Sequence, residues 1–162
     1  MSRRVVVTGM GGISPLGSRW DEIGARLRAG QNAVRFMEEW QDIRDLNTRL
    51  AAPATAFSLP AERYNRKTTR SMGRVALLAC RATDFALSDA GLAEDSALLR
   101  SGRAGVSYGS SAGAMAAIAD FGHMITHHAV DGLNANSYIR MMGHTAPVNI
   151  AVLFGLRGRV HT

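Results

Sequence analysis

Short β-branched runs alternate along this chain with long segments of helical spacing, and this alternation limits the possible fold more than any other feature. Residues 4–9, "RVVVTG", and residues 103–108, "RAGVSY", have the composition of buried strands, and a further extended run starts at Val160. Strand, helix, strand, helix in this order predicts an α/β layered fold. Three strands beside several alanine-rich helices make an incomplete sheet, so we expect the chain to be part of a larger α/β body.

Four segments carry apolar or small residues at spacings of three and four, which predicts helices. They are residues 19–29, 68–90, 112–127 and 146–154. Ser18 and Thr145 are suited to cap the first and the last of these helices, and Gly30 and Gly155 are suited to end them. The stretches between are predicted to be irregular with one short strand (31–62) or a loop (131–138).

Composition indicates a folded protein with a basic surface. Apolar residues make up 46% of the 162 residues and charged residues 20%, which is the balance of a globular domain. No apolar run of roughly 18 residues occurs, so no membrane span is expected. The N-terminal apolar stretch is too short for a signal peptide, which favours a cytoplasmic location. The net charge of +6 suggests an acidic partner, either nucleic acid or protein, although compositional bias also produces such a balance.

The segment "RYNRKTTRSMGR", residues 63–74, concentrates this positive charge. If the segment is helical, its cations form one basic ridge, because they recur at spacings of three and four: Arg63, Arg66, Lys67, Arg70 and Arg74. Glu62 is the acidic residue nearby in the sequence. A docking acidic helix or a phosphate would relieve the repulsion along such a ridge, whereas the alternative is a solvated face. Nucleic acid is less favoured, because Tyr64 is the one aromatic residue interleaved with the cations.

Residues 109–113, "GSSAG", fit the G-x-S-x-G pattern of a nucleophile elbow, with a predicted strand before and a predicted helix after. Ser111 would then be the nucleophile of a serine hydrolase. Its partners would be Asp120 or Asp131 and His144 or His161. The alternative is a turn of small residues that lets another chain or a ligand approach the backbone.

Three weaker patterns favour structural interpretations. "TGMGGIS" after the first predicted strand has Ser14 where a dinucleotide fingerprint needs its third glycine, so a tight turn is expected. His123 and His127 share a helical face and His128 follows, but no third ligand is evident, so solvated histidines are favoured over a metal site. Cys80 is the single cysteine, which excludes an internal disulfide, and its apolar neighbours indicate a core thiol.

Four stretches together resemble a known family. They are "RRVVVTGMGGISPLG", "RKTTRSMGRVALLACRATDFALSDAGL", "GVSYGSSAG" and "FGLRGRV". In order and spacing they resemble the N-terminal half of the β-ketoacyl-acyl carrier protein synthases, condensing enzymes of the thiolase superfamily. The resemblance runs from Arg4 to Thr162. It implies a thiolase-like layered α-β-α-β-α fold, of which residues 1–162 form the N-terminal ketosynthase part, with the second half absent.

The resemblance places the catalytic residues outside this sequence. In the family a strand after "GLRG" leads to a nucleophilic cysteine, which is therefore expected shortly after Thr162. Two histidines and a lysine lie in the second half of family members. None of the residues of these types in this chain matches them: Cys80, His123, His127, His128, His144 and His161. The family chemistry is nucleophilic catalysis with oxyanion stabilisation, so no metal or redox cofactor is expected.

The resemblance also implies a docking surface for an acidic acyl carrier protein. Lys67 and Arg70 fall on matching positions, and Arg66 adjoins them. Ser71 stands where relatives often have another basic residue, which is expected to weaken or redirect docking.

An acyl pocket follows from the same resemblance. "GSSAG" matches the turn that lines the acyl site, which makes Ser110, Ser111 and Ala112 candidates. Ala112 replaces a bulky gate residue and leaves room for an acyl chain other than a standard saturated one. Residues 131–147 match the part that reaches across a dimer interface, with a homodimer or a heterodimer of related subunits expected. Further pocket candidates are Tyr138, Met141 and Met142, for which core or interface packing is the alternative. "SYIRMMGHTAPVN", "MEEW" and "GLRGRV" resemble the branch that builds aryl polyenes or related polyketides.

Three hypotheses therefore remain open from the sequence. The first is a condensing enzyme that extends an acyl thioester with malonyl-acyl carrier protein. The second is a non-catalytic, chain-length-determining partner subunit that keeps the fold and lacks the nucleophile. The third is a serine hydrolase at Ser111.

Overall fold

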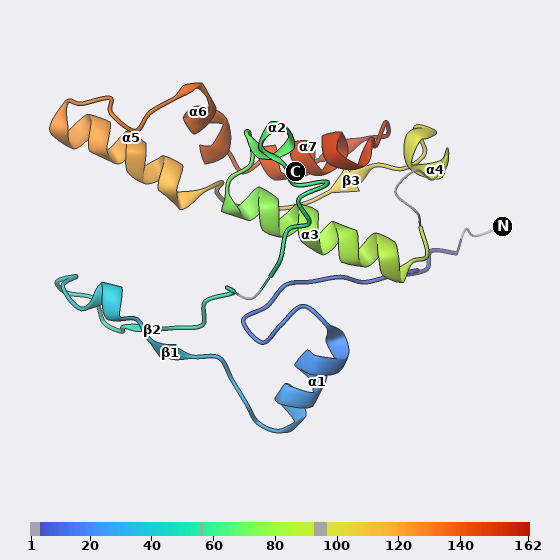
Figure 1. Ribbon diagram of the computed structural model, residues 1–162, viewed down its shortest axis with the longest axis horizontal. Coiled ribbons are helices and arrows are strands. Elements are labelled where there is room, and N and C mark those ends of the chain that lie inside the picture. Colours follow the sequence, from blue (N-terminus) through green and yellow to red (C-terminus); the bar gives the residue numbers. More distant parts are fainter. Residues whose placement is uncertain (1–3, 56, 93–96) are drawn as a thin grey trace.

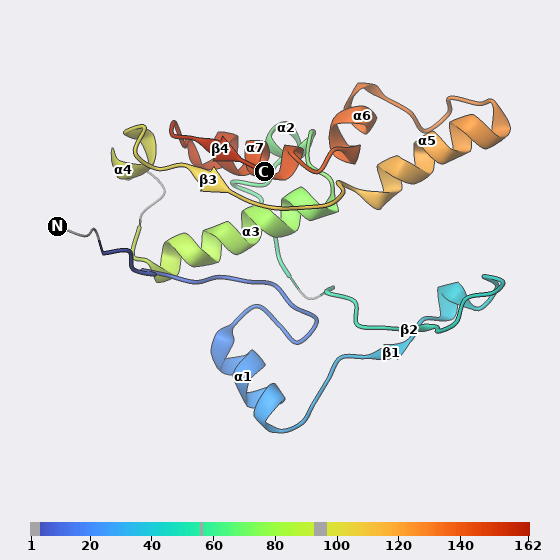
Figure 2. The ribbon, with the colours of Figure 1, turned by 180° about the vertical axis from the view of Figure 1, so that it is seen from behind.

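The computed structural model describes residues 4–55, 57–92 and 97–162. Its elements in chain order are α1 Trp20–Arg28, β1 Arg35–Phe36, the 3-10 helix η1 Glu38–Trp40, β2 Leu50–Ala51, α2 Arg66–Thr69, α3 Arg74–Asp89, α4 Ala97–Arg100, β3 Val106–Ser107, α5 Met115–His127, α6 Ala135–Met141, α7 Thr145–Phe154 and β4 Val160–His161. The part from α1 to β2 projects from one side of a body built around α3 and α7 (Figures 1 and 2).

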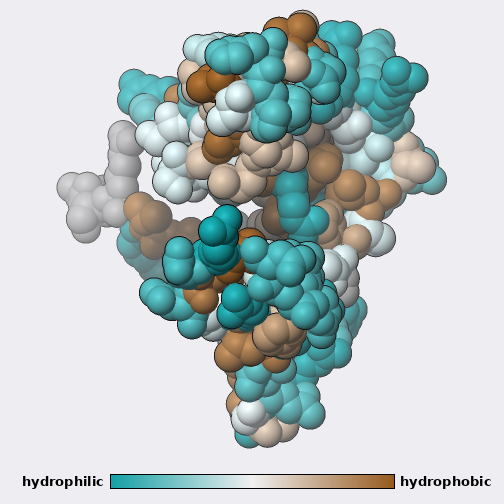
Figure 3. All heavy atoms as spheres, turned by 90° about the vertical axis from the view of Figure 1, so that its left-hand side faces the viewer, coloured by the Kyte–Doolittle hydropathy of each residue, from teal (hydrophilic) through white to brown (hydrophobic). Residues whose placement is uncertain are grey.

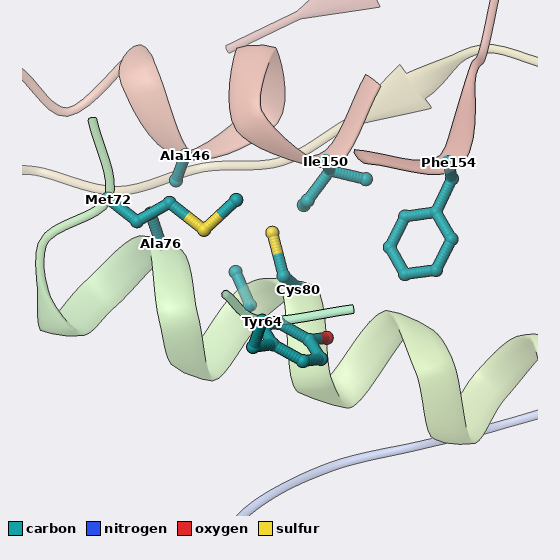
Figure 4. Close-up of a cluster of buried hydrophobic side chains, with 8 residues drawn as sticks. Tyr64, Met72, Ala76, Cys80, Ala146, Ile150 and Phe154 are labelled. Atoms are coloured by element: carbon teal, nitrogen blue, oxygen red, sulfur yellow. The ribbon is translucent and has the colours of Figure 1, made fainter. Parts of the chain in front are cut away.

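The core lies where α3 packs against α7. Small side chains of α3, Ala76, Ala79 and Cys80, are buried against Ala146, Ile150 and Phe154 of α7. Met72 and Tyr64, from the segment before α3, close the same cluster, as Figure 4 shows. Small residues on α3 allow α7 to approach closely, which is how an alanine-rich helix contributes to a core. The long alanine-rich segment of the sequence therefore packs as its composition predicts.

A parallel pair of strands lies beside α7. Val106 of β3 is opposite Val160 of β4, and Ser107 is opposite His161. The amide of Val106 donates to the carbonyl of Arg159 at 2.8 Å. Gly105 permits this pairing, because a Cβ there would overlap the backbone of Arg159. The strands predicted at 103–108 and from Val160 are confirmed, although each is short.

The strand predicted at residues 4–9 is wrong. These described residues form no ladder, and Val5 is 95% exposed. A β-branched run needs a neighbouring strand to pair with, and this segment lies instead along the C-terminal half of α3. Gly9 and Gly11 make that approach possible, because a Cβ on either would overlap the α3 backbone. The amide of Met10 donates to Asp89 at 2.8 Å. The glycines of "TGMGG" thus serve close packing on a helix.

The helix predicted at 68–90 is broken into α2 and α3. Asn65 caps α2, because its side chain accepts hydrogen bonds from the amides of Lys67 and Thr68. Gly73 has an extended backbone and starts α3 anew. The periodicity of apolar residues continues through the break, so it gives no signal of it.

Smaller differences concern the ends of helices. The first helix begins at Trp20 with Arg19, not Ser18, as its N-cap. The predicted loop 131–138 is helical from Ala135, because Asn134 and Ser137 form a capping box. The helix predicted from residue 112 begins at Met115. The last helix begins at Thr145 with His144, not Thr145, as its N-cap, whereas Gly155 ends it with a left-handed backbone, as predicted. Residues 31–62, apart from Ala56, which lies outside the described residues, contain the short antiparallel pair β1 and β2.

Candidate functional site

Three of the predicted docking cations lie together on and after α2. Arg66, Lys67 and Arg70 are exposed, and Asn65 fixes the start of the helix through hydrogen bonds of 3.0 and 3.2 Å. In the described part of the chain no ion pair neutralises any of the three. They therefore form a positive surface that can attract an acidic partner.

The predicted single ridge does not form, because the break between α2 and α3 sends its outer members elsewhere. Arg74 donates to the carbonyl of Ala54, and its guanidinium lies over the ring of Phe57, 5.5 Å from the ring centre. Arg63 pairs with Asp84 of α3 and is only 15% exposed. The acidic residue that pairs with a cation of this segment is thus Asp84, which binds Arg63. Asp84 is distant in the sequence, which is why the sequence pattern indicated Glu62 instead.

Asp84 of α3 is the centre of a part-buried polar network that includes the segment before α2. It also accepts the hydroxyl of Tyr64 at 2.5 Å and Nη1 of Arg81 at 3.2 Å. Burial and the hydrogen bond to Asp84 raise the pKa of the Tyr64 phenol well above its usual range. The network ties the segment before α2 to α3.

Ser71 faces inward rather than onto the docking surface. Its hydroxyl donates to Oδ1 of Asn149 at 2.8 Å, and Nδ2 of Asn149 donates to the carbonyl of Thr145 at 2.8 Å. Asn149 is buried in α7. Ser71 therefore anchors the junction between α2 and α3 to α7, a role that its place in a basic segment did not indicate.

The structure brings the "GSSAG" turn onto the end of α6. The amide of Gly113 donates to the carbonyl of Met141 at 2.9 Å, and the amide of Ala114 donates to that of Arg140 at 2.7 Å. Ser110 is part-buried and its hydroxyl donates to the carbonyl of Ala112 at 2.6 Å. The backbone of Ser110 lies directly against Gly143. Of the predicted pocket residues, Ser110 to Ala112 thus lie beside Met141 and Met142.

Tyr138 stands apart from this group in its exposure. It is 56% exposed on α6, next to Ile139, which is 41% exposed, while Ser137 is buried. Tyr138 therefore lies at the surface. Viewed from this end of the molecule, hydrophobic residues are distributed over the surface among hydrophilic ones (Figure 3).

A hydrolase triad is not assembled. Ser111 is exposed, and within residues 4–55, 57–92 and 97–162 no hydrogen bond joins it to a histidine. His123 lies 3.7 Å from Asp131 and stacks on His127, with ring centres 4.3 Å apart. His144 and His161, the histidines proposed for the triad, are both exposed, and Asp131 faces His123 instead.

The described residues contain neither a metal-binding cluster nor an accessible thiol. The described residues contain no group of three or more His, Cys, Asp or Glu side chains able to hold a metal ion. Cys80 is fully buried, and burial raises the pKa of its thiol to about 12. Such a thiol is protonated at neutral pH and cannot act as a nucleophile.

No helix among the described residues has the length and apolar character needed to cross a bilayer.

Comparison with known proteins identifies the family. The family described as "Beta-ketoacyl synthase, N-terminal domain" matches residues 2–162. A curated relative, 3-oxoacyl-[acyl-carrier-protein] synthase 1 of Haemophilus influenzae, is 37% identical over 93 residues, which are 57% of this chain and 22% of that protein. The chain belongs to the β-ketoacyl synthase family, and the sequence-based assignment is confirmed.

Solved structures support the same assignment. A crystal structure of a beta-ketoacyl synthase from Burkholderia phymatum STM815 is 50% identical with a TM-score of 0.91, over 99% of this chain and 39% of that one. A type II PKS ketosynthase, solved in complex with its acyl-carrier protein, has a TM-score of 0.71 at 20% identity, over 98% of this chain and 42% of the other. The second likeness concerns the fold alone. The predicted thiolase-like ketosynthase fold is confirmed, and the chain spans between about a fifth and two fifths of these relatives.

Proposed function

We propose that this chain is the N-terminal part, residues 1–162, of an acyltransferase that performs decarboxylative condensation. A cysteine after Thr162 takes an acyl group from a thioester. Malonyl-acyl carrier protein then loses carbon dioxide, and its enolate carbon attacks the acyl-cysteine carbonyl, which releases the thiolate. The product is a β-ketoacyl-acyl carrier protein. The observation that carries this proposal is the match of the β-ketoacyl synthase domain to residues 2–162.

The acyl carrier protein is the proposed partner of Arg66, Lys67 and Arg70. Their exposure and lack of ion pairs among the described residues support this role, because unneutralised cations steer an acidic partner toward its site. Ser71 points inward to Asn149 and adds no charge to the surface that these three cations form.

Five residues of one subunit are proposed to line its acyl pocket: Ser110, Ser111, Ala112, Met141 and Met142. Tyr138 of the second subunit in a dimer is proposed to complete this pocket. Contact between the turn and the end of α6 supports the first five, and the exposure of Tyr138 supports the last. The dimer is proposed to be formed with an identical or a related ketosynthase subunit. The aryl polyene branch remains our proposal for the product class.

Labelling the full-length protein tests the catalytic proposal. Iodoacetamide should modify one cysteine in the peptide after Thr162 and abolish condensation, while Cys80 stays unmodified because its thiol is buried and protonated. A folded protein with no reactive cysteine there would instead be the non-catalytic, chain-length-determining partner. A fluorophosphonate probe that labels Ser111, and fails on Ser111→Ala, would support the hydrolase.

Charge reversal tests the docking proposal. Lys67→Glu with Arg70→Glu should raise the dissociation constant for the acyl carrier protein roughly tenfold or more at low salt, and the difference should shrink as salt is added. Arg44→Glu, an exposed cation between η1 and β2, is the matched control. If the wild type, the double variant and Arg44→Glu bind the acyl carrier protein with equal affinity, the cations of α2 form a solvated face with no role in docking.

A further inference from the structure

Arg140 contacts both parts of the candidate site. Its Nη2 donates to the main-chain carbonyl of Arg70 at 2.6 Å, although the two residues are 70 positions apart. Its own main-chain carbonyl accepts the amide of Ala114 at 2.7 Å, directly after the "GSSAG" turn. Arg140 of α6 thus joins the C-terminal end of α2 to the turn that is proposed to line the acyl pocket.

The surroundings of Arg140 indicate a fixed position rather than a solvated one. The residue is half-buried and borders a cavity of about 390 Å³, together with Met72, Gly73, Asp120 and Ser137. Its Nε is buried and has no hydrogen-bond partner among the described residues. Among the described residues, the hydrogen bond that holds this guanidinium is therefore the one from Nη2 to the carbonyl of Arg70.

The docking segment needs such an anchor. Helix α2 has four residues, which is too short to be stable by itself. The last carbonyls of a helix have no partner within it, and a cation placed there is favourable. Arg70 is the C-terminal cap of α2, so its carbonyl is the place where a guanidinium from another element can hold the segment.

We propose that Arg140 is a positioning residue that fixes the carrier-docking cations of α2 relative to the acyl-pocket turn. This inference rests on the proposed function. Lys67 and Arg70 contact the acyl carrier protein through their charges, whereas Arg140 acts through the main chain of Arg70. Removal of Arg140 lets the docking segment shift while the charges on it remain.

Steady-state kinetics of Arg140→Met in the full-length protein test this role, because Met keeps the bulk of the side chain and removes the donor. KM for the acyl carrier protein should rise roughly fivefold to twentyfold, and kcat should fall by less. The rise should shrink as salt is added, because the charges that Arg140 positions are then screened. In the Lys67→Glu, Arg70→Glu background it should largely vanish, because the cations to be positioned are gone.

Two further variants make the result specific. Arg140→Lys, which keeps a cationic donor, should restore part of the affinity, and Arg103→Met, which removes an exposed arginine elsewhere, should behave as the wild type. Thermal unfolding reports whether Arg140→Met folds; if it does not, Arg140→Lys carries the test with a rise of roughly twofold to fivefold.

The two ideas fail in different ways. If Arg140→Met matches Arg103→Met while Lys67→Glu, Arg70→Glu loses affinity, the role of Arg140 is overturned and the docking surface stands. A loss in Arg140→Met that persists undiminished in the Lys67→Glu, Arg70→Glu background would make Arg140 an independent docking cation and also overturns the positioning role. A wild-type protein without any condensation overturns the proposed function itself.

Discussion

At the scale of single residues, Asp84 joins the segment before α2 to α3. Its carboxylate balances Arg63 and Arg81 and accepts the Tyr64 hydroxyl, and its side chain is 11% exposed. Asp84→Asn keeps the shape and removes the negative charge that faces the part-buried guanidinium groups of Arg63 and Arg81. We expect the free energy of unfolding to fall by about 3 kcal/mol, measured by urea denaturation.

The control for this variant is Asp42→Asn. Asp42 is exposed, and substitutions at such positions usually change the free energy of unfolding by less than about 0.5 kcal/mol. Equal urea midpoints for the two variants would show that the network contributes nothing measurable to the fold.

Cys80 provides a residue-scale test of burial and pH. Because the pKa of its thiol is raised to about 12, the thiolate is scarce in the folded protein at every pH below that value, whereas an unfolded thiol ionises near its usual pKa of about 8.5. Iodoacetamide at pH 8.5 should therefore modify Cys80 in urea and leave it unmodified in native buffer. Peptide mass spectrometry measures both; equal modification would mean that the site between α3 and α7 opens readily.

Single residues differ in how far the sequence predicted them. Cys80 was predicted as a core thiol, because its neighbours at helical spacing are apolar. The pair of Arg63 with Asp84 was not, since it depends on the backbone break that follows α2. The contacts of Arg140 and Ser71 were not predicted either. Their partners lie 70 and 78 positions away in the sequence, and no local sequence pattern connects residues so far apart.

The contact between the "GSSAG" turn and α6 is the element-scale feature on which the proposed acyl pocket depends. A Cβ at Gly113 would overlap the carbonyl of Arg140, whereas Gly109 has open space around it. Gly113→Ala should therefore lower the free energy of unfolding by about 1–3 kcal/mol, and Gly109→Ala should leave it nearly unchanged. Thermal denaturation of the two variants compares them directly; similar midpoints would mean that the turn does not rest on α6.

At the scale of elements, composition predicted which segments are helical better than where they begin. Helix α7 follows its prediction, because Pro147 in its first turn and Gly155 after its end are strong local signals. Helix α6 was predicted as a loop, because seven residues show too little periodicity and the Asn134 capping box was overlooked. The break before α3 is set by packing of Met72 and Ser71 onto α7, which is tertiary information.

At the scale of the molecule, the family and the incomplete sheet could be predicted from the sequence, and the place of residues 4–9 could not. A run such as "RVVV" is suited to the interior of a sheet, but only strands beside it can make it one. The described residues supply the pair β3 and β4 and the pair β1 and β2, and residues 4–9 join neither. Their valines remain exposed for that reason.

The outer face of α7 carries the last prediction. Val148 is 46% exposed and Val152 is 76% exposed, on a helix whose other face is the core. Exposed apolar side chains on a central helix favour association with another surface. The 162 residues expressed alone should therefore self-associate, and Val152→Lys should shift them toward the monomer in sedimentation velocity. Leu27→Lys, which charges an exposed leucine of α1, is the matched control. If the wild-type chain sediments as a monomer, or if the two lysine variants have equal effects, the exposed face of α7 does not drive association.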